Sequence, residues 1–200
     1  MSEERARWQT RYSGATPASA AAGDRAPSSW VIERCLALPA DGVVVDVAAG
    51  LGRHAVALAE RGRRVVALDF VEDAVRVAVQ RAWGVSGEVW GCVADAVALP
   101  FADGTLDLIV TVNFLDRSLF PSFARLLRPG GHLVAETYTR RHADLVASGL
   151  ARAPRNPAYM LDSGELPSLV APLRVVDGHE EHVRDEAGER WVAGVVAVRA

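Results

Sequence analysis

The chain has 200 residues, enough for one domain with a substantial hydrophobic core and too few for two domains of ordinary size. Apolar residues make up 50% and charged residues 24% of the sequence, which excludes a largely disordered chain. The formal net charge of −3 gives no broad basic surface, so we expect neither nucleic acid nor a membrane as a partner. All basic residues are arginine, which excludes enzymes that need a lysine Schiff base and P-loop nucleotide hydrolases.

Cysteine usage and apolar runs indicate the compartment. Cys35 and Cys92 are too few for a cysteine zinc site or a disulfide framework, and they suggest a reducing environment. The first nine residues are charged and do not look like a secretory signal. Apolar runs such as residues 43–47 are far shorter than the roughly 20 residues that cross a membrane. We therefore expect a cytoplasmic protein.

The N-terminal part differs in composition from the rest. Residues 1–30 are expected to form an arm or lid, followed by a single domain over residues 31–200. Within the arm, residues 13–29 are rich in Ala, Gly, Ser, Thr and Pro without a period, which predicts a loop. Trp8, Arg11 and Tyr12 are the large side chains that stand out before this stretch.

Strand and helix patterns alternate through the remaining chain. Strands are predicted over residues 43–47, 64–68, 88–94, 106–112, 132–138, 173–183 and 190–199. Helices are predicted over residues 29–38, 52–61, 71–83, 115–128 and 164–170. This order predicts an α/β, Rossmann-like, doubly wound fold. Its seven-stranded sheet should be mostly parallel, with helices on both faces and a C-terminal antiparallel hairpin.

Polar residues stand at the ends of four predicted parallel strands. These residues are Asp46, Asp69, Asp95 and Asn113. Ligands of doubly wound sheets bind at the carboxyl ends of the strands, near the point where the strand order reverses. We therefore expect these four side chains to share one ligand site.

The first strand leads into a glycine-containing turn, Asp46-Val-Ala-Ala-Gly-Leu-Gly-Arg-His54. Its small residues let a ligand approach the backbone, and the following helix points its N-terminus at the same place. The spacing also fits the loose dinucleotide fingerprint. Asp69 follows Gly50 by 19 residues, close to the roughly 20 expected for the acid that binds ribose hydroxyls. The turn alone therefore leaves the identity of the adenosine cofactor open.

Three features favour S-adenosylmethionine over a dinucleotide. Asp46 lies four residues before Gly50, where a carboxylate suits the positive charge of a sulfonium and an α-amino group. Asp95 can accept from the exocyclic amine of adenine, and Ala96 beside it leaves room for the ring. The long C-terminal hairpin is an unusual ending for a nicotinamide-binding domain.

Five segments carry a family resemblance: residues 46–54, Ala67-Leu-Asp69, Ala94-Asp95-Ala96, residues 107–113 and Leu127-Arg-Pro-Gly-Gly131. As an ordered set they resemble class I S-adenosylmethionine-dependent methyltransferases. The chain also resembles the tellurite-resistance and thiopurine methyltransferase-like group of that superfamily. That narrower resemblance rests on Trp8, Arg11-Tyr12, Asn156-Pro-Ala-Tyr159 and Gly164-Glu-Leu166. Ala48-Ala49 departs from the family, which often has Gly or Cys there, but alanine is small enough for binding.

The resemblance implies methyl transfer of the EC 2.1.1 type, with S-adenosylmethionine as cofactor. The acceptor would be a small molecule, such as a thiol, a metalloid oxyanion or another metabolite. The residues expected to bind the cofactor are Asp46, Ala48, Ala49, Gly50, Gly52, Asp69, Phe70, Asp95, Ala96 and Asn113.

The implied mechanism is an in-line displacement, in which the protein mainly aligns the two reactants and excludes water. If the acceptor must lose a proton, Asp116 and His54 are the candidates for taking it. If the acceptor is already an anion, Arg11 or Arg117 is expected to orient it. His54 also suits helix packing, and Asp116 also suits an N-cap.

The late strand over residues 173–183 carries His179, Glu180, Glu181 and His182. Adjacent charged residues on a strand usually form a solvated face, so no metal site is expected there. Two other functions fit the cofactor turn: a nicotinamide-dependent oxidoreductase, and a non-catalytic protein that binds a nucleoside. Nucleic-acid methylation is disfavoured, because Asn113-Phe-Leu-Asp116 lacks a Pro-Pro-aromatic core.

Overall fold

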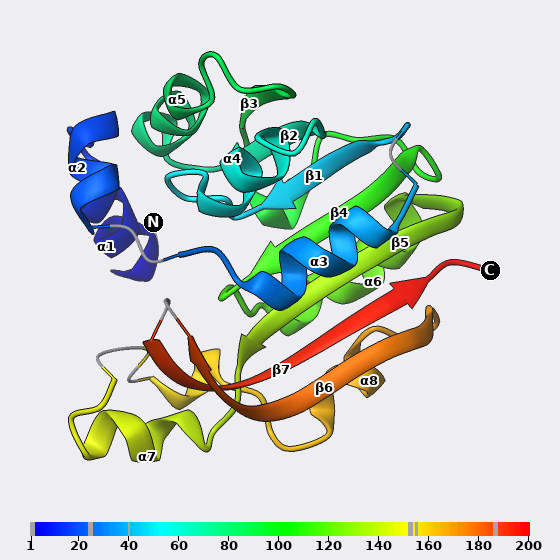
Figure 1. Ribbon diagram of the computed structural model, residues 1–200. Coiled ribbons are helices and arrows are strands. Elements are labelled where there is room, and N and C mark those ends of the chain that lie inside the picture. The colour runs from blue at the N-terminus through cyan, green and yellow to red at the C-terminus, as the bar shows by residue number, and fades with distance from the viewer. Residues whose placement is uncertain (1–2, 24–25, 40, 152–153, 155, 186–187) are drawn as a thin grey trace.

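The computed structural model describes residues 3–23, 26–39, 41–151, 154, 156–185 and 188–200. Within these residues, seven strands form one sheet in the order β3-β2-β1-β4-β5-β7-β6 (Figure 1). The strands are β1 (Val43–Val47), β2 (Arg64–Asp69), β3 (Glu88–Val93), β4 (Leu106–Val112), β5 (Leu127–Tyr138), β6 (Arg174–Asp185) and β7 (Gly188–Val198). Strands β1 to β5 pair in parallel, whereas β7 runs antiparallel to both β5 and β6. The predicted α/β fold with its C-terminal hairpin is confirmed.

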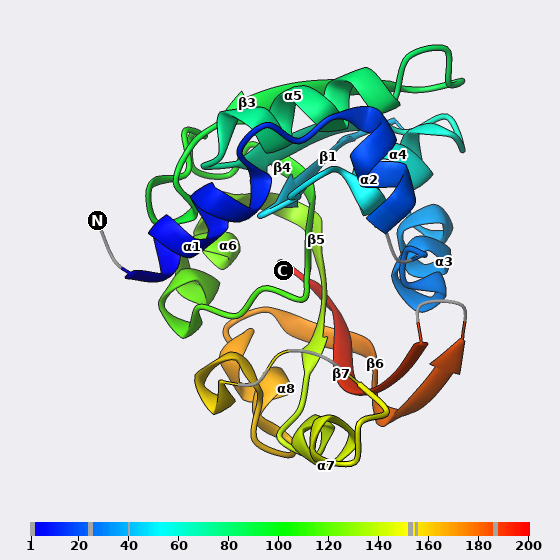
Figure 2. The ribbon, with the colours of Figure 1, turned by 90° about the vertical axis from the view of Figure 1, so that its left-hand side faces the viewer.

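Helices cover both faces of this sheet (Figures 1 and 2). The α-helices are α1 (Glu3–Tyr12), α2 (Pro17–Gly23), α3 (Ser29–Ala37), α4 (Arg53–Ala59), α5 (Glu72–Arg81), α6 (Phe120–Leu126), α7 (His142–Ala147) and α8 (Glu165–Leu169). Short 3₁₀ helices lie at Ala96–Ala98, Arg117–Leu119 and Pro157–Tyr159. Helices α3, α4 and α5 lie on one face, and α6 and α8 lie on the other.

The two faces of the sheet have separate hydrophobic cores. Val44 and Leu108 pack with α3 and α4, whereas the next residues, Val45 and Ile109, pack with α6. This alternation is the geometry of a strand, whose successive side chains point to opposite faces. It explains why the central strands read as continuous apolar runs, since both of their faces are buried.

The N-terminal segment corrects one expectation, because residues 13–29 are not all loop. Helix α2 lies within them, since its alanine-rich sequence has a high helix propensity. Thr16 and Ser19 cap its start reciprocally, with each side-chain oxygen accepting from the other residue's backbone N–H (2.9 and 3.2 Å). Trp8 and Tyr12 lie on a further helix, α1, which the composition did not predict.

The helix predicted over residues 115–128 is shorter in the structure. A 3₁₀ turn precedes α6, and β5 already begins at Leu127. The segment Pro129-Gly130-Gly131, which falls between the predicted helix and the predicted strand, lies inside β5 because it hydrogen-bonds to the C-terminal end of the chain. Gly130 donates to the carbonyl of Arg199 (2.8 Å), and Arg199 donates to that of Gly131 (2.9 Å).

A close contact between α4 and α5 fixes the start of α4. Gly52 precedes α4 with φ of +79°, and a β-carbon built there would lie 2.5 Å from Ala78 Cβ. Gly62, after α4, has a similar φ of +82° but no atom within 4 Å of its built β-carbon. Both glycines therefore hold a left-handed backbone, and only Gly52 also allows two helices to pack.

We expect Gly62→Ala to lower the free energy of unfolding by about 1–2 kcal/mol, the cost of a left-handed backbone for alanine. We expect Gly52→Ala to lower it by a further ~1–3 kcal/mol, because its methyl group overlaps Ala78. Urea unfolding of both variants measures the difference. Equal losses would contradict the packing contact.

Candidate functional site

The carboxyl ends of β1 and β2 bring together the first group of predicted residues. Asp46 on β1 is paired in register with Ala67, two residues before Asp69, so both carboxylates lie on the same face of the sheet. The two are close enough for their charges to interact. The turn after β1 lies over them, because Gly50 donates its N–H to Asp69 Oδ2 (2.9 Å).

That turn has a strained backbone. Ala48 has φ of +58°, and Gly50 and Gly52 have φ of +54° and +79°. Non-glycine residues with positive φ are uncommon and cluster at ligand sites. A second such residue, Asn113 (φ +58°), follows β4, the neighbour of β1, so two adjacent strands are each followed by a residue with a left-handed backbone.

Asp46 is the most perturbed acid of the site. Its side chain is 2% exposed, and Oδ2 has no hydrogen-bond partner among the described residues. Burial raises its pKa to about 7, against a hydrogen bond from the backbone N–H of Ala55 that favours the charged form. A buried acceptor without a partner costs free energy unless a ligand satisfies it, so Asp46 is suited to a donor group of a bound molecule.

Asp69 is buried too, but both of its oxygens have partners. Val71 donates its N–H to Oδ1 (3.0 Å), and Gly50 donates to Oδ2. Burial raises the pKa of Asp69, although these backbone hydrogen bonds oppose the shift. Each carboxylate oxygen has two lone pairs, so Asp69 keeps acceptor capacity for a vicinal diol.

The predicted adenine-binding residues lie next to helix α1. Arg5 of α1 is ion-paired with Asp95, and its guanidinium stacks 4.5 Å from the ring centroid of Phe70. Asp95 also caps the 3₁₀ helix that begins with Ala96, accepting from the N–H of Val97 (3.2 Å). Figure 2 shows α1 crossing the carboxyl edge of the sheet.

Tyr12, at the other end of α1, reaches the glycine turn. Its hydroxyl oxygen lies 2.9 Å from where a β-carbon on Gly50 would be. Tyr12 stacks on Trp8, with ring centroids 5.5 Å apart. Helix α1 therefore covers the glycine turn through Tyr12 and the predicted adenine-binding residues through Arg5.

Arg117, a catalytic candidate, is engaged in a contact between two loops. It binds both carboxylate oxygens of Glu165 (2.5 and 2.8 Å) and donates to the carbonyls of Ala158 and Met160 (3.1 Å each). This side chain joins the segment after β4 to the start of α8. Its geometry is that of a structural ion pair.

The two proton-transfer candidates also have structural partners. His54 is buried, and its Nε2 accepts the N–H of Ser28 (3.1 Å). Burial, together with the charge of Arg53, lowers the pKa of His54 well below its usual range. Asp116 caps the following turn, accepting from the N–H of Ser118 (2.9 Å) and from its hydroxyl (2.6 Å).

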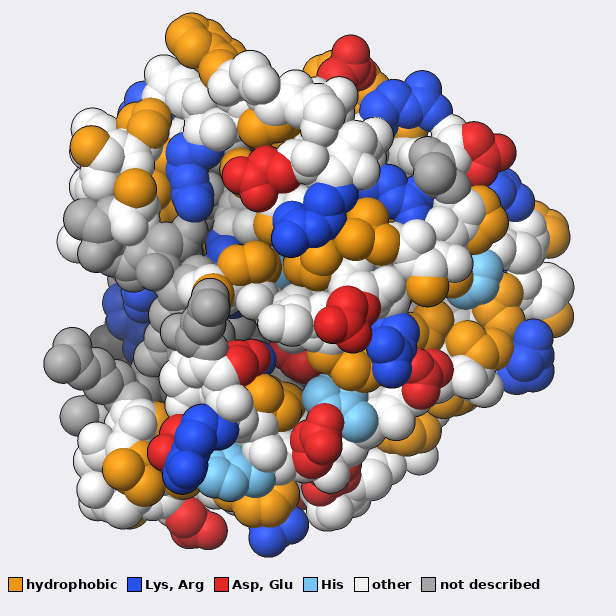
Figure 3. Space-filling view, in the orientation of Figure 1, with side chains coloured by type: hydrophobic (Ala, Val, Ile, Leu, Met, Phe, Trp, Pro, Cys, Tyr) orange, Lys and Arg blue, Asp and Glu red, His pale blue; other side chains and the backbone are white. Residues whose placement is uncertain are grey.

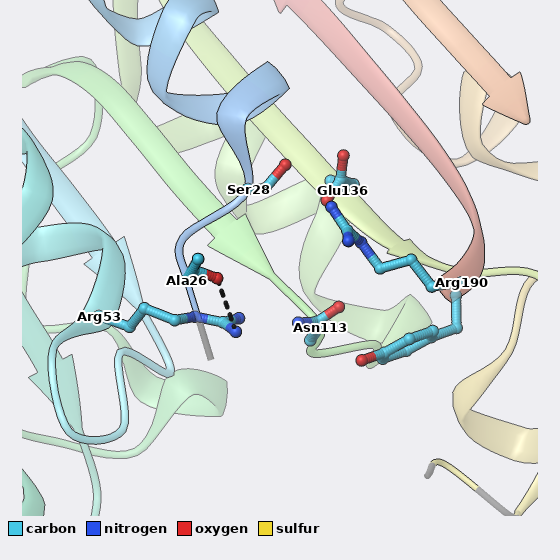
Figure 4. A pocket seen from close by; sticks show the side chains of 7 residues that line it. Ala26, Ser28, Arg53, Asn113, Glu136 and Arg190 are labelled. Atoms are coloured by element: carbon cyan, nitrogen blue, oxygen red, sulfur yellow. Dashed lines mark hydrogen bonds between the residues drawn. The ribbon is translucent and has the colours of Figure 1, made fainter. Parts of the chain in front are cut away.

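A pocket adjoins the glycine turn, and most of its residues were not predicted. It is a small, partly open hollow of about 10 Å³, lined by Ala26, Ser28, Arg53, Asn113, Glu136, Tyr138 and Arg190 (Figure 4). Of the predicted residues, only Asn113 lines it, and its N–H donates to the backbone carbonyl of Glu136 (2.9 Å). Glu136 gave one signal in the sequence, as a lone charge inside an otherwise apolar strand.

The late histidines also differ from expectation. The prediction of a solvated face is wrong for His179, whose side chain is 11% exposed and stacks on Trp30. In the described part of the chain, no group of three or more His, Cys, Asp or Glu residues could hold a metal ion. No helix among these residues is long and apolar enough to cross a membrane.

The site fits an adenosine cofactor such as S-adenosylmethionine. Asp46 offers a buried oxygen without a partner, and Asp69 offers acceptors at the end of the next strand. The positive φ angles of Ala48 and Gly50 turn the backbone between them. The ring of Phe70, another predicted cofactor-binding residue, is covered by Arg5 of α1.

Known proteins were compared with the chain. Residues 44–131 match a family model described as a methyltransferase domain. A demethylmenaquinone methyltransferase of Thermobifida fusca (strain YX) is 40% identical over 100 residues, 46% of this chain and 42% of the relative. A putative 23S rRNA (guanine-N(1)-)-methyltransferase of Micromonospora griseorubida is 37% identical over 62% of this chain and 45% of the relative. The chain thus spans less than half the length of these relatives.

The fold also matches solved structures. A S-adenosylmethionine-dependent methyltransferase from Methanosarcina mazei superposes with a TM-score of 0.69 at 20% identity. The match covers 84% of this chain and 96% of that one. Residues 44–131 are therefore similar to a methyltransferase domain, and the chain shares its Rossmann-like fold with this solved structure.

Proposed function

We propose that the chain is an S-adenosylmethionine-dependent methyltransferase that acts on a small-molecule acceptor. The observation that carries this proposal is the pair of buried carboxylates, Asp46 and Asp69, around a strained glycine turn inside the matched methyltransferase domain. An oxidoreductase would use the turn and Asp69 but has little use for Asp46. A protein that only holds a nucleoside would use all three without turnover.

The predicted residues would contact different parts of the cofactor. Asp69 would accept from the ribose hydroxyls, Asp95 and Phe70 would contact the adenine, and Asp46 would face positive charge. The backbone at Ala48, Ala49, Gly50 and Gly52 would lie along the ligand. When bound, S-adenosylmethionine supplies an activated methyl group. The chain's residues therefore need only hold and orient the two reactants and exclude water from them.

The acceptor is proposed to be small and not a nucleic acid. Among the relatives, the names demethylmenaquinone methyltransferase and 23S rRNA methyltransferase point to different acceptors. The net charge of −3 gives no excess of positive charge to neutralise phosphates. On the face shown in Figure 3, acidic and basic side chains are interspersed. A thiol, a metalloid oxyanion and a hydroxylated metabolite are all compatible with this surface.

Residues 1–30 are proposed to form a cover over the cofactor site. Support comes from Arg5, whose guanidinium lies over the ring of Phe70 and forms an ion pair with the carboxylate of Asp95. A ligand that binds both must displace Arg5. Because the ion pair is half-exposed, displacing it costs little, about 0.2–1 kcal/mol for such pairs.

Asp69→Ala should weaken the binding of S-adenosylhomocysteine by about 1–3 kcal/mol, because charged hydrogen bonds to the ribose are lost. Isothermal titration calorimetry measures the affinity. Asp103→Ala, which removes an exposed carboxylate paired with Arg125, is the matched control and should bind like the wild type. If the wild type binds NADH and not S-adenosylhomocysteine, the oxidoreductase alternative holds instead.

The pKa of Asp46 predicts a pH dependence of this affinity. At pH values below its pKa of about 7, the carboxyl group of Asp46 is protonated and loses the charge that attracts the ligand's ammonium group. The dissociation constant should therefore be larger at pH 6 than at pH 8, by up to about tenfold. Titrations of Asp46→Asn at both pH values should show little of this change. A wild-type affinity that is constant or higher at pH 6 would contradict the assignment.

Arg5→Ala should tighten S-adenosylhomocysteine binding by up to several-fold, because the variant removes a side chain that competes for Phe70 and Asp95. Arg7→Ala, on the same helix with its guanidinium over Trp8, is the control. Both are measured by the same calorimetry. Weaker binding by Arg5→Ala alone would mean that Arg5 contacts the bound ligand and does not compete with it.

A further inference from the structure

The register of the C-terminal strands places an acid and a histidine together beside the pocket. On β5, Glu136 pairs with Gly194 of β7, and on β6, His179 pairs with the same glycine. A β-carbon on Gly194 would lie 2.5 Å from His179 Nε2 and 2.9 Å from the ring of Trp30. The missing side chain therefore lets His179 reach across β7 to Glu136.

His179 is fixed in this position from three sides. Its Nε2 lies 3.3 Å from Glu136 Oε2, and its Nδ1 lies 2.9 Å from Glu181 Oε1. Trp30 stacks on its ring, with ring centroids 4.5 Å apart. Burial opposes a charge on the ring, but the contacts with Glu136 and Glu181 outweigh it and raise the pKa of His179. An imidazolium at this position forms an ion pair with Glu136.

Glu136 faces the pocket with acceptor capacity to spare. Its side chain is 2% exposed, and Oε2 has no hydrogen-bond partner among the described residues. Oε2 lies close enough to His179 Nε2 for an ion pair, but the two groups are not aligned for a hydrogen bond. A carboxylate oxygen in this state is suited to a hydroxyl donor of a bound molecule.

Cationic groups surround the same space. Figure 4 shows Arg190 of β7 and Glu136 of β5 extending toward each other, with Arg53 on the opposite side. Arg190 is held by both oxygens of Asp185 (2.5 and 2.8 Å), which fixes its guanidinium. Positive charge near a bound hydroxyl favours its ionised form, so the pocket suits an acidic hydroxyl such as a phenol.

We propose that the hydroxyl of the methyl acceptor enters this pocket, that this hydroxyl is acidic and phenol-like, and that Glu136 is its proton acceptor. This inference rests on the proposed function. The O–H bond of the acceptor breaks, the proton passes to Glu136 Oε2, and the electron pair stays on the oxygen, which becomes the methyl-accepting nucleophile. His179 is a positioning residue, which orients Glu136 through the contact between its Nε2 and Glu136 Oε2. The pocket adjoins Asn113, one of the predicted cofactor-binding residues.

Binding of phenol is the direct test, with anisole as a matched probe that lacks the hydroxyl. Protein with ¹⁵N-labelled histidine, with and without saturating S-adenosylhomocysteine, is titrated with each probe while the His179 ring signals are followed by NMR. Phenol should shift these signals in a saturable way, and anisole should not. If anisole shifts them as strongly, or phenol does not shift them, the assignment of the pocket is wrong. This comparison uses the wild type and requires no variant.

Glu136→Gln keeps the shape of the side chain and removes its basicity. It should abolish the phenol response, lower the rate of phenol methylation by about 10²–10⁴-fold, and leave the affinity for S-adenosylhomocysteine unchanged. Glu189→Gln is the control, because Glu189 pairs with His182 (3.4 Å) on the same hairpin and does not line the pocket. Thermal unfolding verifies that both variants fold.

Other outcomes separate this inference from the proposed function. If the wild type binds no S-adenosylhomocysteine, the proposed function fails, and the phenol comparison without cofactor still judges the pocket. If the cofactor product binds and Glu136→Gln methylates phenol like the wild type, Glu136 is not the proton acceptor. For His179→Gln, we expect the pH profile of phenol methylation to shift while cofactor affinity is retained. A change in stability with an unaltered profile would mean that His179 is only structural.

Discussion

Burial of acidic groups at the carboxyl edge of the parallel sheet is the constraint on which the site depends. Asp46 and Asp69 lie where strands end, and both are removed from water. Asp69 is stabilised by two backbone N–H groups, whereas Asp46 keeps an oxygen without a partner among the described residues. The strained turn after β1 supplies one of those N–H groups. Desolvation that destabilises the free protein becomes useful when a ligand donates hydrogen bonds or brings positive charge.

The sequence was sufficient for most of the sheet. β-branched runs that are apolar on both faces identify buried parallel strands. The ends of these strands are also local features of the sequence, marked by Asp46, Asp69 and Asn113. The helix cover was harder to predict. Residues 17–23 have a composition that also suits a loop, and the contact of Arg5 with Asp95 joins residues 90 positions apart. No local pattern encodes such a contact.

The pocket next to the cofactor turn was missed for a related reason. Glu136, Arg190 and His179 lie on three different strands, and they meet only through the register that aligns Glu136 and His179 with Gly194. The charged residues around His179 predict an exposed strand, and β6 is largely exposed. His179 is an exception because a glycine on the neighbouring strand leaves a hollow, which is visible only once the hairpin is paired.

A crystal structure of the protein with S-adenosylhomocysteine tests the central claim most directly. The account predicts that the ribose hydroxyls lie within hydrogen-bond distance of Asp69, that the amino group of the ligand faces Asp46, and that Arg5 leaves the ring of Phe70. A ligand bound away from the ends of β1 and β2, with Arg5 still on Phe70, would contradict it.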